Sequence, residues 1–66
     1  MGCSIIVKGH LDQRWSEWFE GLTIIHRENG QTMLAGQLPD QAALHGVLTK
    51  VRDLDLTLVT VQCADQ

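Results

Sequence analysis

Few side chains in this 66-residue sequence are able to do chemistry: three histidines, two cysteines and eight carboxylates. A metal site needs three or four ligands with defined geometry, and none of the spacings CxxC, HxxxH or HExxH occurs. No serine or cysteine lies in a nucleophile motif, there is no glycine-rich phosphate loop, and Asp12 and Asp40 are explained as helix caps. We therefore predict no metal, no cofactor and no catalytic residue.

The two cysteines, Cys3 and Cys63, lie near opposite ends of the sequence. A bridge between them would close almost the whole chain and stabilise the fold by ~4 kcal/mol. Disulfides are rare in the cytosol, however. We expect reduced thiols that pack near each other and that can oxidise on isolation.

All three aromatic residues fall between Trp15 and Phe19, in the stretch LDQRWSEWFEGL. Trp15, Trp18 and Phe19 could form a stacking platform for a flat ligand, or they could fill the end of a small core. Their spacing of three and four is that of one helical stripe, and no basic cluster lies beside them. The core interpretation is therefore favoured, because aromatic side chains bury the most area per residue.

Strands and helices alternate along the chain. A strand is expected over residues 4–10, followed by a helix of two turns that Asp12 begins and Gly21 ends. Asn29-Gly30, a strong signal for a two-residue type I′ turn, joins two further strands over residues 22–28 and 31–38. After Pro39 and the cap Asp40, the apolar spacing predicts a longer helix as far as Leu54, and residues 56–63 form the last strand.

The order of these elements predicts a single α+β domain over residues 1–66. It is similar to the ferredoxin-like split β-α-β-β-α-β fold, a four-stranded antiparallel sheet with two helices on one face. Right-handed crossovers place the first and third strands at the centre and the last strand beside the first. With Ile5 opposite Val61, Cys3 then faces Cys63 and Val7 faces Val59, while Ile25 faces Leu34 in the hairpin.

In this register the other face of the sheet has no covering layer and carries many apolar side chains. An open apolar face usually marks an interface or a ligand groove, and a face-to-face homodimer is the simplest solution for a domain with a small core. The predicted interface or ligand face consists of Ile6, Lys8, His10, Ile24, His26, Met33, Leu56 and Leu58, with Leu22 and Ala35 beside them.

Two segments, WSEWFEGLTI (residues 15–24) and DQAALHGVLTKVRDLDL (residues 40–56), carry a resemblance. They resemble short uncharacterised bacterial proteins that share a Trp-Ser-x-Trp-Phe block and an Asp-Gln-Ala-Ala-Leu-His-Gly helix. The resemblance implies a bacterial, cytosolic origin and brings no activity with it.

The net charge of −3 and the scattered basic residues argue against nucleic acid as a partner. No apolar run approaches the ~18 residues of a membrane span, and no basic segment precedes an apolar one as in an export signal. We expect a cytoplasmic, self-associating interaction module, and this role is favoured over that of an enzyme. The alternative is a small cofactor-free, oxygenase-like enzyme with a pocket near His10 and His26 at the open face.

Overall fold

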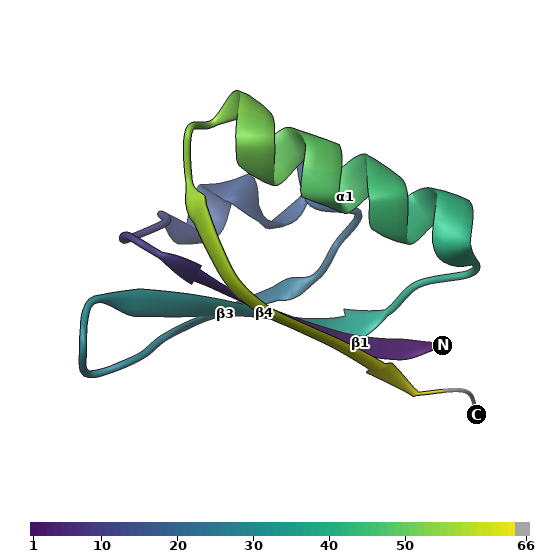
Figure 1. The fold of residues 1–66 in the computed structure, drawn as a ribbon, viewed down its shortest axis with the longest axis horizontal. Coiled ribbons are helices and arrows are strands. Elements are labelled where there is room, and N and C mark those ends of the chain that lie inside the picture. Colours follow the sequence, from purple (N-terminus) through teal and green to yellow (C-terminus); the bar gives the residue numbers. More distant parts are fainter. Residues whose placement is uncertain (65–66) are drawn as a thin grey trace.

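Four strands, one α-helix and one 3-10 helix follow each other in the computed structural model, which describes residues 1–64. They are β1 (Gly2–Lys8), η1 (Gln13–Ser16), β2 (Thr23–His26), β3 (Gln31–Gln37), α1 (Gln41–Asp53) and β4 (Thr57–Ala64). Every strand pair is antiparallel, and the order β2-β3-β1-β4 is the one expected from right-handed crossovers. Figure 1 shows α1 and η1 on the same side of the sheet.

The predicted ferredoxin-like arrangement with two helices is wrong, because α1 is the one α-helix within residues 1–64. Between β1 and β2 the chain forms only η1 and a series of turns. Most of their hydrogen bonds join residues three apart, such as the Trp15 amide to the Asp12 carbonyl and the Glu20 amide to the Glu17 carbonyl. Glu20 has a φ of 59°, which ends any helical turn there. Two turns are too few for a helix to form without strong propensity.

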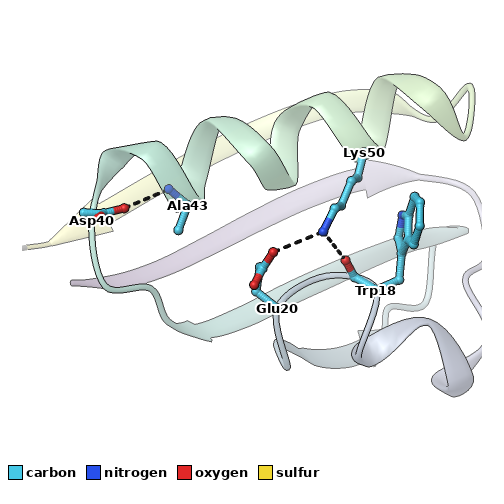
Figure 2. A network of polar contacts seen from close by, with 5 residues as sticks. All are labelled: Trp18, Glu20, Asp40, Ala43 and Lys50. Carbon is cyan, nitrogen blue, oxygen red and sulfur yellow. Dashed lines mark hydrogen bonds and ion pairs between the residues drawn. The ribbon is translucent and has the colours of Figure 1, made fainter.

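The longer helix forms where the sequence predicts it. The Asp40 carboxylate accepts a hydrogen bond of 2.9 Å from the Ala43 amide and so caps the first turn of α1 (Figure 2). Val47 and Val51 are buried against the sheet. Asp55, with a φ of 58°, ends the helix in the left-handed conformation. No helix of residues 1–64 is long and apolar enough to cross a membrane.

The hydrophobic core lies between the sheet and the layer formed by α1 and the turns after β1. Thr32 is fully buried within it, and its hydroxyl donates to the Gly9 carbonyl and accepts from the Leu11 amide. These hydrogen bonds fix the start of the first crossover, the segment of residues 9–22 that connects β1 to β2. The buried apolar residues are Cys3, Ile5, Val7, Leu11, Phe19, Leu22, Ile24, Leu34, Leu38, Val47 and Val51.

The turn between β2 and β3 contains Asn29-Gly30, as predicted, but it is not a type I′ turn. The Arg27 amide donates to the Gln31 carbonyl across a loop of three residues, Glu28 to Gly30. Gly30 has a φ of 76°, whereas the non-glycine residues with positive φ in the described chain do not include Asn29. This is the pattern of a three-residue hairpin whose last residue is left-handed.

The extra turn residue changes which side chains of β2 enter the core. Ile24 lies opposite Leu34, where Ile25 was predicted, and Ile25 lies opposite Met33. A shift of one residue moves every side chain of a strand to the other face. Consequently Ile24 is 3% exposed in the core and Ile25 is 40% exposed on the opposite face.

The predicted register between β1 and β4 is confirmed at one end of the strand pair and is wrong at the other. Ile5 lies opposite Val61, as predicted. Val7 lies opposite Leu58 instead of Val59, because a β-bulge shifts the register between Ile6 and Val7. Leu58 and Val59 are 45% and 44% exposed.

Candidate interaction surface

Within residues 1–64, no element packs on the face of the sheet turned away from α1 (Figure 1). In β1 the alternation that buries Ile5 and Val7 places Ile6 on this open face. Met33 lies opposite Ile6 in β3, and Ile25 lies opposite Met33 in β2. These three side chains form an apolar row across neighbouring strands, in which Ile6 and Met33 are half-buried and Ile25 is exposed.

Polar residues surround this apolar row. The register places Ser4 opposite Ala35 and Gln62, and Thr60 opposite Ile6. The open face is therefore less apolar than the sequence predicted. Two cationic residues lie at its end: Lys8 on β1, and Arg27, whose Nη1 atom lies 3.9 Å from the Met33 Sδ atom. The other residues of this face, assigned by pairing and alternation, are Thr23, Gln31, Ala35, Gln37, Thr57 and Gln62.

The eight residues predicted for the interface do not all share this face. Ile6, Lys8 and Met33 do, whereas Ile24 lies in the core. Leu56 precedes β4 and packs half-buried against the core. Leu58 is exposed on β4 at the bulge, beside Val59, which the prediction had placed in the core.

His10 and His26 are together, but they do not lie on the open face. Their rings stack with centroids 3.9 Å apart, and the His26 Nε2 atom forms a hydrogen bond with the Leu11 carbonyl oxygen. His26 lies opposite the buried Thr32, so its register is that of the covered face. A shallow depression of about 420 Å³ lies beside it, lined by His26, Arg27, Glu28 and Asn29. In residues 1–64 no three His, Cys, Asp or Glu side chains are grouped to share a metal ion.

The aromatic window is divided between core and surface. Phe19 is fully buried, Trp15 is half-buried, and Trp18 is 43% exposed. The Lys50 ammonium lies 5.2 Å from the Trp18 ring centroid, donates to the Trp18 carbonyl at 2.8 Å and pairs with Glu20 at 3.1 Å (Figure 2). The exposed indole therefore serves to attach the first crossover to α1.

Cys3 and Cys63 face each other across β1 and β4, and they form a disulfide. The predicted pairing is confirmed, and the expectation of reduced thiols is not met. Cys3 is buried and Cys63 is exposed. The bridge borders an open depression of about 800 Å³, lined by Gly2, Cys3, Ser4, Gly36, Gln37, Val61, Gln62, Cys63 and Ala64.

The features that the sequence did not reveal are the exposure of Ile25 and of Val59. Each follows from one extra residue, in the hairpin turn or in the bulge. The comparison with curated proteins and the comparison with solved structures each find no match. Residues 2–62 match the family model of a domain of unknown function (DUF8691), and because this match covers most of the chain, the protein belongs to that family.

Proposed function

We propose that this protein is a small interaction module that associates with itself through its sheet. The observation that supports the proposal is the single covering layer: α1 and the first crossover pack on one face, and no element within residues 1–64 covers the other face, which carries Ile6, Ile25 and Met33. Exposed apolar side chains that adjoin one another favour a contact surface.

The size of the chain supports self-association. A domain of 66 residues buries a small fraction of its surface compared with larger domains, and association is one of the usual ways to compensate. A second copy is always present at the same concentration, and a two-fold dimer needs only one self-complementary surface.

The enzymatic alternative has weaker support. It requires a pocket at the open face beside His10 and His26, but the two rings stack on each other in the register of the covered face. The depression near His26 is shallow and is formed by the hairpin turn. An interaction role needs no such pocket.

The proposed setting is the bacterial cytoplasm, which rests on the sequence resemblance. The Cys3–Cys63 disulfide weighs against that setting, because disulfides persist mainly in oxidising compartments. Alkylation of thiols in intact cells, followed by mass spectrometry, distinguishes the cytoplasm from an oxidising compartment. Unmodified cysteines in the cell would place the protein in an oxidising compartment and contradict the cytoplasmic proposal.

The mass of the purified protein in solution tests the proposed function. We expect light scattering across a concentration series to approach at least twice the chain mass of 7.4 kDa. A mass of one chain at every concentration up to the solubility limit would contradict self-association.

A further inference from the structure

The outer edge of β4 is an unpaired strand edge. β4 spans eight residues, Thr57–Ala64, and is the last strand of the order β2-β3-β1-β4. Its backbone pairs with β1, and no other hydrogen bond within residues 1–64 involves β4. A strand at the edge of a sheet presents a row of free N–H and C=O groups, which are the groups that another strand recognises.

The opposite edge of the sheet is protected. β2 is only four residues long. The Gln13 side-chain amide donates to the Ile24 carbonyl at 2.9 Å, and the Ser16 hydroxyl donates to the Leu22 carbonyl at 2.6 Å. The first crossover thus covers this edge with its own polar groups, one of the ways in which proteins prevent edge-to-edge pairing.

β4 carries no comparable protection. Its sequence, TLVTVQCA, contains neither a charged residue nor a proline, the two kinds of residue that commonly block an exposed edge. Leu58 and Val59 are exposed at its start. Beyond the bulge, Thr60–Ala64 pairs regularly with β1, so this part offers an undistorted edge.

We propose that β4 pairs antiparallel with β4 of a second copy of the chain, so that two four-stranded sheets join into one sheet of eight strands. This inference rests on the proposed function and names its partner and contact. Two observations favour a second copy: the uncharged strand repels no identical strand, and each chain has one free edge, so that pairing closes at two subunits.

The joined sheet has a consequence for the open face. A two-fold axis between antiparallel neighbours in one sheet stands perpendicular to that sheet, so both open faces lie on the same side. The apolar rows that include Ile6 and Met33 would then belong to one larger surface, while the two α1 helices cover the other side.

The test uses opposite charges on the edge. In a two-fold pair centred on the regular part of β4, Gln62 lies close to Gln62 of the second copy. Gln62 is exposed, so Gln62→Lys and Gln62→Glu should each fold as the wild type does. We expect each variant alone to raise the dimer dissociation constant on the order of tenfold or more, because like charges meet across the contact. An equimolar mixture of the two variants should recover the wild-type affinity.

Two controls carry the same added charge elsewhere. Ile25→Lys lies on the open face and Thr49→Lys on the exposed side of α1. Circular dichroism and melting confirm that every variant is folded before its mass is measured.

The outcomes separate the two proposals. Weak association of the edge variants, recovery in the mixture and normal association of both controls support pairing through β4. If Ile25→Lys dissociates the dimer while the edge variants do not, the β4 inference is overturned and self-association through the open face stands. If the wild-type chain is monomeric at all concentrations, both self-association and the pairing of β4 with a second copy are contradicted.

Discussion

At the scale of single residues, Trp18 and Phe19 are neighbours with opposite surroundings. Phe19 has no exposed surface, whereas Trp18 is 43% exposed and contacts Lys50. Apolar spacing predicted that both are buried, since an α-helix would place them on one stripe. The turns that replace the helix direct only one of them into the core.

The difference gives a paired prediction. Phe19→Ala should lower the free energy of unfolding by about 3–5 kcal/mol, because it leaves a cavity in the core, and this loss is enough to unfold much of so small a domain. Trp18→Ala removes an exposed ring and one cation–π contact, and it should cost about 1 kcal/mol. Urea denaturation followed by circular dichroism measures both. Equal losses for the two variants would show that Trp18 is buried in solution.

At the scale of elements, the sequence predicted the existence of all four strands and of α1, while small irregularities decided which side chains are exposed. A dipeptide such as Asn29-Gly30 fits both a two-residue and a three-residue hairpin, and the two differ by one residue of register. That residue exchanges Ile24 and Ile25 between core and surface. The bulge in the pairing of β4 has the same effect at Val59 and has no signal in the sequence.

Two glycine substitutions test the turn and the helix together. Gly30 has a φ of 76°, so Gly30→Ala should destabilise the protein by ~1 kcal/mol. Gly46 lies inside α1, and a methyl group added there would meet no atom within 4 Å. Gly46→Ala should therefore stabilise the protein by about 0.5–1 kcal/mol. Thermal melting distinguishes the two signs. A stabilising Gly30→Ala would contradict the left-handed turn.

At the scale of the whole molecule, general rules of chain connection predicted the strand order, and with it the meeting of Cys3 and Cys63. The second helix was predicted by analogy with a fold, and the segment between β1 and β2 forms only η1 and turns, because a helix of two turns is too short to be stable by itself. The sequence predicted that one face of the sheet is open, but two shifts of register, in the hairpin and at the β-bulge, changed which side chains this face carries. Ile6 and Met33, which lie in the regular central pairing, were placed correctly.

The disulfide ties together nearly the whole chain, since its cysteines are 60 residues apart. Reduction should lower the free energy of unfolding by ~4 kcal/mol, because the unfolded chain regains the entropy that the closed loop removes. Denaturation with and without dithiothreitol measures this loss, and a Cys63→Ser variant, which should not respond to the reductant, is the control. The same midpoint in both conditions would mean that the two thiols are not bridged.

The pairing of β4 with a second copy is tested most directly by amide hydrogen exchange, resolved by residue and measured at low and high protein concentration. The β4 amides that point away from β1 should exchange rapidly in dilute solution and slowly in concentrated solution, because only the dimer supplies their acceptors. The amides of β2, at the protected edge, should exchange at the same rate in both. Rapid exchange of the outward β4 amides at a concentration where light scattering shows a dimer would contradict the account.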